Sequence, residues 1–289
     1  MQFGFLSRSV DDIEKAARIG FDGIELNTAA FGNAAEGDLD AGRVALAKEQ
    51  SERLGVTITA LAHYGLTGQS LEPAPVLATY RRVFDTAERL GVQVVASMSG
   101  FHADRTWDEN VQAFGDRFGP VADEAERRGI VLAMENWMGY GGHLPFRPVN
   151  MGGSPDTWDS WFQVVPSKAL GIEFEPSHLY WQGVDHMRAL KEYADRVYHV
   201  HAKDVEDLPE TRYRIGANGL AFRFRIPGYG EINWPEFIAG LVEIGYDGGV
   251  AIEHEDDVFG WHTPGPRYDD GLVRGWQVLE PLIHPTGRP

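Results

Sequence analysis

The stretch Ile19-Gly-Phe-Asp-Gly-Ile-Glu-Leu26 combines an apolar residue followed by glycine, a short polar turn and a new apolar run. This order is typical of a helix end, a tight turn and the start of a strand. A second copy, Ile244-Gly-Tyr-Asp-Gly-Gly-Val-Ala-Ile-Glu253, lies near the other end of the chain. Shorter versions occur at Leu54-Gly-Val-Thr-Ile58 and Leu90-Gly-Val-Gln-Val94. The repeated joint predicts a chain in which helices and strands alternate.

Apolar runs with little strict alternation, spread between these joints, predict eight strands that are buried on both faces. We expect them at Phe3–Leu6, Gly23–Leu26, Val56–Ala62, Val92–Met98, Ile130–Glu135, Leu170–Glu175, Val197–His201 and Gly249–Glu253. Helical patterns cover residues 10–19, 41–54, 75–90, 108–128, 156–165, 185–194, 235–244 and 267–283. Eight such units in 289 residues favour an α/β fold with one (β/α)8 TIM barrel, a single catalytic domain over residues 1–289.

An open, doubly wound sheet is the competing fold, but the glycine-rich phosphate loop expected near its first strand is absent. Two long segments, Asn136–Pro155 and Asp204–Asn233, interrupt the regular alternation. Both follow strands, so we expect them at the mouth of the barrel, where loops bind a substrate or close over it.

The composition narrows the classes of function. The formal net charge is -17, from 43 acidic residues against 26 Lys and Arg, so the surface repels phosphate groups. Binding to nucleic acid or to a membrane is therefore not expected. No cysteine is present, which excludes disulfides, thiolate zinc sites and cysteine nucleophiles. Since no secretory signal and no membrane-length apolar run is evident, we expect a soluble, cytoplasmic protein.

Acidic and imidazole side chains recur at the ends of the last four predicted strands. Glu135, Glu175, His201 and Glu253 each stand at the carboxyl end of a strand. In a barrel these ends converge at one mouth, where three carboxylates need a positive partner. One imidazole with three carboxylates suits Mn²⁺, Mg²⁺, Co²⁺ or Fe²⁺ better than Zn²⁺. His199 precedes His201 by two residues and points the same way but deeper, so a structural role is expected for it.

These motifs together resemble the xylose-isomerase-like sugar phosphate isomerase/epimerase superfamily. The resemblance rests on strand-end Glu135, on Glu175-Pro-Ser-His178, on His201-Ala-Lys-Asp204 and on a final Ile252-Glu253. The stretch Arg225-Ile-Pro-Gly-Tyr-Gly-Glu-Ile-Asn-Trp234 is similar to a Pro-Gly-x-Gly segment of that family. One departure is Glu175, where the family usually has aspartate, and this leaves its mode of coordination open.

The resemblance implies a TIM barrel with one divalent ion, Mn²⁺ in the first place and Mg²⁺ or Co²⁺ as alternatives. The family's metal positions carry over to Glu135, Glu175, His201 and Glu253, and His178 matches a position that contacts metal or substrate. The implied activity is that of a sugar isomerase or epimerase, which moves a proton beside a carbonyl through an enediolate. Glu135 and Glu253 come from different strands, so we expect them to be the catalytic acid/base pair.

Other side chains near the predicted mouth are candidates for binding the substrate, a sugar or polyol. They are His178, His63, Glu25, Trp137, Lys203 and Arg225. Loop packing, or a salt bridge between Lys203 and Asp204, is the alternative role for such residues. The acidic charge and the missing phosphate loop favour a neutral sugar over a phosphate ester.

Two other activities remain open. The first is a metal-dependent lyase or C-deglycosylating subunit that acts on 3-oxo-sugars by the same enolisation, with a small partner subunit. The second and less favoured is a hydrolase like the abasic-site endonucleases. The negative charge and the lack of an Asp-x-His pair between His201 and Glu253 argue against it. A homo-oligomer is also compatible with the sequence, which names neither the sugar nor the stereocentre.

Overall fold

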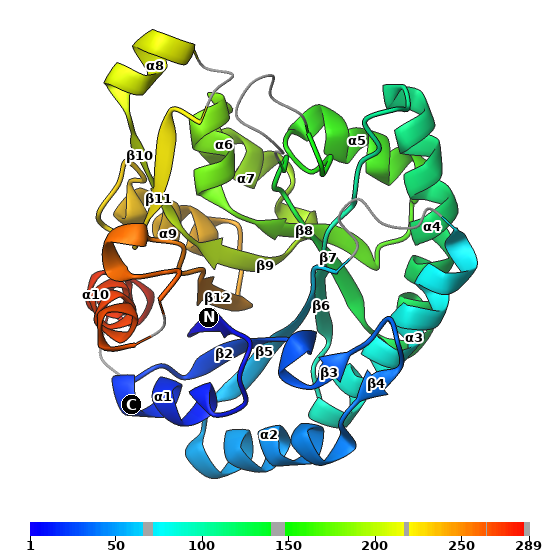
Figure 1. Ribbon diagram of the computed structural model, residues 1–289, viewed down its shortest axis with the longest axis horizontal. Coiled ribbons are helices and arrows are strands. Elements are labelled where there is room, and N and C mark those ends of the chain that lie inside the picture. Colours follow the sequence, from blue (N-terminus) through cyan, green and yellow to red (C-terminus); the bar gives the residue numbers. More distant parts are fainter. Residues whose placement is uncertain (66–71, 140–147, 217–219, 264, 286–289) are drawn as a thin grey trace.

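The computed structural model describes residues 1–65, 72–139, 148–216, 220–263 and 265–285 (Figure 1). Eight parallel strands close into a barrel in the order β1-β12-β9-β8-β7-β6-β5-β2, which confirms the expected (β/α)8 fold. β1 closes the barrel because it pairs with both β12 and β2. Each expected strand and helix is present, with bounds shifted by no more than two residues.

The barrel strands are β1 (Gln2–Ser7), β2 (Gly23–Asn27), β5 (Thr57–His63), β6 (Val94–Ser97), β7 (Val131–Glu135), β8 (Leu170–Phe174), β9 (Val197–Ala202) and β12 (Gly249–Ile252). The helices that surround them are α1 (Asp12–Ile19), α2 (Ala41–Leu54), α3 (Pro73–Leu90), α4 (Trp107–Arg128), α5 (Pro155–Val164), α7 (His186–Glu192), α9 (Trp234–Glu243) and α10 (Pro266–Ile283). Shorter elements are α6 (Pro176–Gln182), α8 (Pro209–Ile215) and two hairpins, β3 (Gly32–Asn33) with β4 (Asp38–Leu39) and β10 (Asp204–Asp207) with β11 (Phe222–Arg225).

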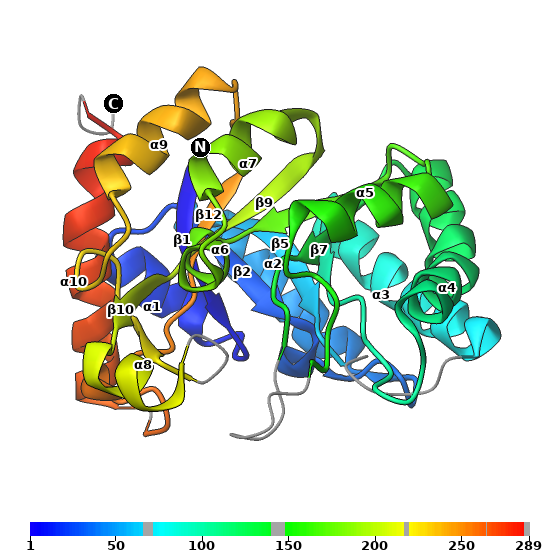
Figure 2. The ribbon, with the colours of Figure 1, turned by 90° about the horizontal axis from the view of Figure 1, so that it is seen from above.

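The main hydrophobic core lies between the strands and the outer helices. In the turned view of Figure 2, helices such as α4, α9 and α10 form the outer layer. Phe114 of α4 stacks on Trp161 of α5 with ring centroids 5.1 Å apart, and both side chains are fully buried. The glycines at the helix–strand joints end the helices: Gly55, at φ 68°, donates its N–H to the Ser51 carbonyl. Within the described ranges, no helix combines the length and apolar character needed to cross a membrane.

The interior of the barrel is polar near the mouth. Glu25, Glu173, His199 and His201 come from three strands and are completely buried. Gly249 makes room for the His199 ring, since a Cβ on Gly249 would lie 2.9 Å from His199 Nε2 and 2.6 Å from Thr59 Cβ. The His199 ring therefore fills space that any larger residue at this point of β12 would need.

The segment Asp204–Asn233, expected as a long loop at the mouth, contains the β10–β11 hairpin and α8. The hairpin is antiparallel and pairs Asp204 with Arg225 and Asp207 with Phe222. α8 buries none of its residues and projects from the barrel (Figure 1). The other expected mouth segment, Asn136–Pro155, includes residues 140–147, which lie outside the described residues.

The buried carboxylate of Asp204 anchors this segment. It accepts five hydrogen bonds of 2.9–3.1 Å, from the backbone N–H groups of Val205, Gly228, Gly230 and Ile232 and from the Trp234 indole. A Cβ on Gly230 would lie 2.4 Å from Asp204 Oδ1. The second glycine of the Pro-Gly-Tyr-Gly stretch is thus required by a close approach of the backbone to this carboxylate.

We expect Asp204→Ala to lower the free energy of unfolding by about 3 kcal/mol or more, because hydrogen bonds to a charged group contribute about 1.5–3 kcal/mol each. Urea and thermal unfolding measure this loss. The matched control is Asp207→Ala in the same hairpin. Asp207 is partly exposed and pairs with Arg212, so its loss should cost less than about 1 kcal/mol. Wild-type stability of Asp204→Ala would contradict the anchoring role.

Candidate metal centre

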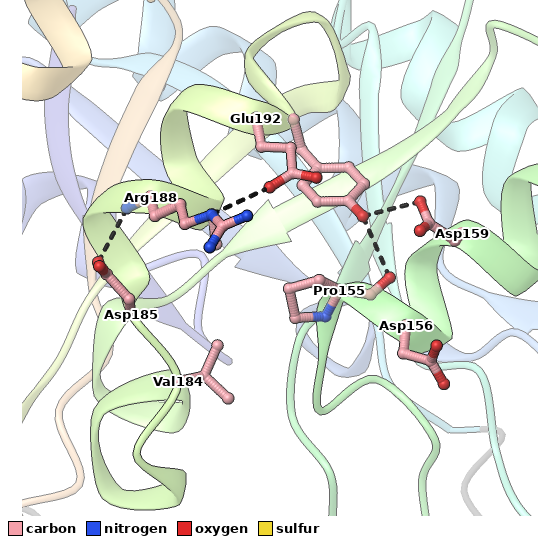
Figure 3. A pocket seen from close by; sticks show the side chains of 9 residues that line it. Pro155, Asp156, Asp159, Val184, Asp185, Arg188 and Glu192 are labelled. Atoms are coloured by element: carbon pink, nitrogen blue, oxygen red, sulfur yellow. Dashed lines mark hydrogen bonds and ion pairs between the residues drawn. The ribbon is translucent and has the colours of Figure 1, made fainter.

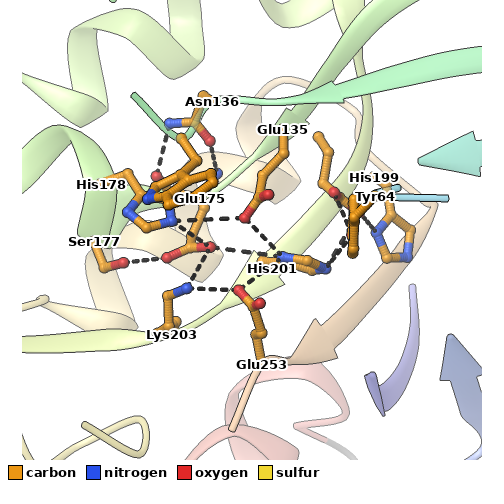
Figure 4. Close-up of polar contacts among 12 residues, drawn as sticks. Tyr64, Glu135, Asn136, Glu175, Ser177, His178, His199, His201, Lys203 and Glu253 are labelled. Carbon is orange, nitrogen blue, oxygen red and sulfur yellow. Dashed lines mark hydrogen bonds and ion pairs between the residues drawn. The ribbon is translucent and has the colours of Figure 1, made fainter. Parts of the chain in front are cut away.

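The four strand-end residues expected to bind a metal come together at one end of the barrel (Figure 4). Glu135 ends β7, Glu175 follows β8, His201 lies in β9 and Glu253 follows β12. One possible ligand atom from each lies within 4.8 Å of the others. His201 Nδ1 is 3.3 Å from Glu253 Oε2, 3.6 Å from Glu175 Oε2 and 3.9 Å from Glu135 Oε1. The structure therefore brings these side chains to a common centre.

The donor atoms of this cluster fit a divalent cation. Glu135 Oε2, Glu175 Oε2 and His201 Nδ1 are buried and have no hydrogen-bond partner among the described residues. A buried polar atom without a hydrogen bond is costly, so three of them in one cluster of residues favour a site that a cation completes. Three carboxylates and one imidazole suit Mn²⁺, Mg²⁺ or Co²⁺. The cluster can therefore hold a metal ion of this group.

Both the backbone and the side chain of Glu175 are held in place. Its N–H donates to Asn136 Oδ1 at 2.6 Å, and Asn136 Nδ2 donates to the Glu175 carbonyl at 2.9 Å. Ser177 Oγ donates a short hydrogen bond to Glu175 Oε1. One carboxylate oxygen is thereby engaged, and Oε2 is left to face the centre. A glutamate in place of the usual aspartate can thus present a single oxygen ligand.

Lys203 brings a positive charge into the cluster. Its Nζ lies 2.6 Å from Glu253 Oε2, 2.9 Å from Glu255 Oε2 and 3.3 Å from Glu175 Oε2, and its side chain is 1% exposed. Burial alone would lower the pKa of this ammonium group, but attraction to the carboxylates raises it well above its ordinary value. Lys203 therefore remains charged. It pairs with these glutamates because Asp204 is already bound by its own segment.

The remaining negative charge is reflected in the pKa values of the carboxyl groups. Burial, reinforced by repulsion from Glu253, raises the pKa of Glu135 to about 7. Burial acts in the same direction on Glu253, but attraction to Lys203 and His201 outweighs it and lowers the Glu253 pKa. A cation bound at the cluster would offset this burial and repulsion and favour the ionised form of Glu135.

His178 and Trp137, expected to bind substrate, lie next to the possible ligands. His178 Nε2 is 3.3 Å from Glu175 Oε2 and 3.6 Å from Glu135 Oε1. The His178 ring meets Phe224 of the β10–β11 hairpin edge-on, with centroids 5.3 Å apart. The Trp137 ring lies 6.5 Å from the His178 ring. The rings of His178 and Trp137 therefore form part of the wall around the candidate metal centre.

A second group of buried side chains lies behind His201. Glu25 was expected near the substrate. Its Oε2 lies 2.8 Å from His201 Nε2, on the side of the ring away from the other candidate metal ligands. Tyr64 donates its hydroxyl to Glu173 Oε2 at 2.7 Å. Sequence reasoning missed Glu173 and Tyr64. Glu173 had a usable signal, because it precedes Glu175 by two residues and so shares its face of the strand, whereas Tyr64 follows its strand and had none.

The deeper group carries less charge than its residue types suggest. Burial, with added repulsion from Glu25, raises the pKa of Glu173 well above its ordinary value despite the attraction of His201. Burial also lowers the pKa of His199 to about 4, so this ring is neutral at pH 7. His199 Nδ1 lies 3.0 Å from Glu173 Oε1. This position fits the structural role expected for His199.

His63 and Arg225, also expected to bind substrate, have partners within the protein. His63 Nδ1 is 3.0 Å from Thr28 Oγ1, and burial lowers the His63 pKa to about 4. Arg225 donates to Asp256 Oδ2 at 2.9 Å and makes a short ion pair with Glu206. His63 therefore lies in the wall of the mouth as a neutral ring, and the Arg225 guanidinium is engaged by two carboxylates.

Two cavities open at the mouth of the barrel. One, of about 660 Å³, is lined by Glu253, Glu255 and Arg8 and by Trp261, which is 37% exposed. The other, of about 420 Å³, includes His63. Small-molecule sites typically occupy about 300–1,000 Å³. A ligand of sugar size therefore has access to the side chains around Glu253.

A separate hollow of about 320 Å³ lies between α5 and α7 (Figure 3). Its polar side chains contact one another. The Tyr193 hydroxyl donates to Asp159 Oδ1 at 2.7 Å, and Arg188 Nε lies 3.7 Å from Glu192 Oε2. None of the four strand-end candidate ligands lines it. The candidate site is therefore the cluster at the strand ends.

Comparison with known sequences places the chain in a family. The sequence profile described as "Xylose isomerase-like TIM barrel" matches residues 13–274. The uncharacterized protein YfiH of Bacillus subtilis is 26% identical, with 85% of this chain and 88% of YfiH aligned. An inosose dehydratase of Lactiplantibacillus plantarum is 25% identical over 64% of this chain, a match that spans 58% of the dehydratase.

Solved structures share the fold. A D-psicose 3-epimerase, crystallised with D-fructose, superposes with a TM-score of 0.73 at 15% identity, covering 98% of this chain and 99% of the epimerase. The Escherichia coli 3-keto-D-glucoside 4-epimerase YcjR gives a TM-score of 0.67 at 17% identity, covering 95% of this chain and 99% of that one. With a family profile that matches most of its length and a closed barrel that ends in the cluster described above, this chain belongs to the xylose isomerase-like TIM barrel family.

Proposed function

We propose that this protein is a divalent-metal-dependent isomerase or epimerase that acts on a neutral sugar or polyol. The observation that carries the proposal is the convergence of Glu135, Glu175, His201 and Glu253. Three of their buried polar atoms have no hydrogen-bond partner among the described residues. The likeness to an inosose dehydratase and to sugar epimerases supports a sugar-acting enzyme. Mn²⁺ is the first expectation for the metal.

Glu135, Glu175, His201 and Glu253 would hold the divalent ion. When bound, it would supply Lewis-acid polarisation of a substrate carbonyl, which makes the neighbouring C–H bond more acidic. Glu135 and Glu253 are the groups that move the proton. Their strands, β7 and β12, are separated in the barrel by β8 and β9, so the two carboxylates reach a substrate from different sides. One removes the proton and the other returns a proton on the opposite face.

Two neighbouring residues support this chemistry. Lys203 Nζ, 2.6 Å from Glu253 Oε2, keeps that carboxylate ionised and oriented. Both ring nitrogens of His178 are buried without a hydrogen-bond partner among the described residues. His178 is therefore suited to bind a substrate oxygen beside Glu135 and Glu175.

A dehydratase or another lyase is the second candidate, favoured by matches to inosose dehydratases. Elimination begins with the same proton abstraction but then needs a proton donor for the leaving oxygen. His178 has the position for this role. Mass spectrometry of the product separates the two activities, because an isomer keeps the mass of the substrate and an elimination product loses water or an aglycone. A small partner subunit or a homo-oligomer stays a prediction.

Removal of divalent ions with EDTA should abolish activity, and Mn²⁺ should restore it. Mn²⁺ at about 100 times its Kd should also stabilise the fold by about 2.7 kcal/mol, measured as a rise in Tm. Glu175→Ala should lose most of this rise because a ligand is missing. Glu255→Gln is the matched control, because Glu255 contacts the same Lys203 without belonging to the ligand cluster. Equal shifts in wild type and Glu175→Ala would contradict the assignment.

Glu135→Gln and Glu253→Gln should each lower turnover by about 10²–10⁴-fold, since each removes a group that transfers a proton. The amide oxygen still binds metal, though more weakly, so metal content is measured on every variant. Deuterium exchange from solvent into substrate is followed separately from product formation. One variant should still exchange the substrate proton without completing the reaction. Near wild-type turnover in both metal-loaded variants would shift the acid/base role to His178.

The substrate preference should favour a free sugar over its phosphate ester. The net charge of -17 repels a phosphate group, and Arg225 is already bound to Glu206 and Asp256. Steady-state kcat/KM on matched pairs of free and phosphorylated sugars tests this. A strong preference for the phosphorylated member would show that a cation such as exposed Arg8, in the cavity beside Glu253, binds the phosphate.

A further inference from the structure

The two ring nitrogens of His201 face different surroundings. Nδ1 points to the candidate metal centre, 3.3 Å from Glu253 Oε2. Nε2 points away from it, 2.8 Å from Glu25 Oε2 and 3.2 Å from Glu173 Oε1. Figure 4 shows the ring between the candidate ligands on one side and Tyr64 on the other. Carboxyl groups thus face both ring nitrogens of His201.

This environment selects one tautomer. A neutral imidazole carries its proton on one nitrogen, and a metal binds to the other. Glu25 accepts a hydrogen bond from Nε2–H, because an unprotonated nitrogen at 2.8 Å would repel the carboxylate. When a cation occupies the centre, the lone pair that binds it lies on Nδ1, which has no hydrogen-bond partner among the described residues. The ligand atom is therefore directed to the centre before a cation binds.

Glu25 is itself fixed by its neighbours. The Tyr64 hydroxyl, which has a single hydrogen to donate, lies within hydrogen-bond distance of two carboxyl oxygens, Glu25 Oε1 at 3.1 Å and Glu173 Oε2 at 2.7 Å. Glu173 Oε1 is 3.0 Å from His199 Nδ1. Glu25, Glu173 and His199 are completely buried, so none of them can turn to solvent. The hydrogen-bonded group leaves the His201 ring a single orientation.

We propose that Glu25, supported by Tyr64 and Glu173, is the positioning residue for His201, and that His201 binds the metal through Nδ1. The inference concerns a ligand of the metal centre and rests on the proposed function. Glu25 orients the ring and, as an anionic acceptor, makes Nδ1 a stronger donor. Partners of this kind typically change metal affinity by about 10–100-fold.

The test measures the Kd of Mn²⁺ by isothermal titration calorimetry on the metal-free, full-length protein. Glu25→Ala should weaken binding by about 10–100-fold. Glu25→Gln keeps a neutral acceptor for Nε2–H and should recover part of the loss. Tyr64→Phe should weaken binding to a smaller extent, because Glu25 loses one support.

Tyr80→Phe is the matched control for Tyr64→Phe. It removes the hydroxyl of another buried tyrosine, which contacts Ser97 and lies outside the group behind His201. Its Kd for Mn²⁺ should equal that of the wild type. Circular dichroism and the Tm in EDTA check that each variant is folded. If Glu25→Ala does not fold, the comparison of Tyr64→Phe with Tyr80→Phe decides the proposal.

A spectroscopic measurement reads the tautomer directly. NMR of isotope-labelled histidine in the cadmium-loaded protein should show coupling of the metal to His201 Nδ1 and a slowly exchanging proton on Nε2. An unchanged Kd in folded Glu25→Ala, or coupling of the metal to Nε2, overturns the positioning role alone. A wild-type protein that binds no divalent ion overturns the proposed function, and this inference with it, so the two failures are distinguishable.

Discussion

The imidazole of His201 lies between two groups of buried carboxyl side chains, and the chemistry of the site depends on this placement. Glu135, Glu175 and Glu253 stand on one side of the ring, and Glu25 and Glu173 on the other. Charges interact strongly in such an interior. The group is stable only if protons and cations are distributed to match its negative charge. The binding of a cation here would therefore be part of the same electrostatic balance as protonation.

The interior of the barrel can be polar because the stability of the fold comes from the apolar layer between the strands and the helices. Large aromatic side chains, such as the stacked Phe114 and Trp161, fill the layer between strands and helices. Burial of this apolar surface is the main favourable term in folding. Small residues such as Gly249 then leave space inside the barrel for imidazole and carboxyl groups. The apolar outer layer stabilises the fold, so the inner surface of the barrel can carry polar side chains for the chemistry of the site.

The alternation of strands and helices could be predicted from sequence because it depends on local pattern. The convergence of the four strand-end candidate ligands could be predicted too, because it depends on one rule about where the ends of barrel strands meet. The group behind His201 could not, because Tyr64 follows a strand and reaches Glu173 only in the closed barrel. The β10–β11 hairpin was missed because its pairing depends on the distant anchor Asp204. The sequence suggested that Arg225 binds an anion of the substrate, because its partners Glu206 and Asp256 lie on other segments of the chain.

Residues 199–204, in and just after β9, have several structural roles. His199, His201 and Lys203 recur at every second position and face the interior, and Asp204 then turns to hold the hairpin segment. Insertion of one residue here would move all the inward side chains to the opposite face. α8 lies beyond the anchor and buries none of its residues, so its length can change without moving a candidate ligand. A change in length is therefore tolerated in the projecting α8 and not in β9.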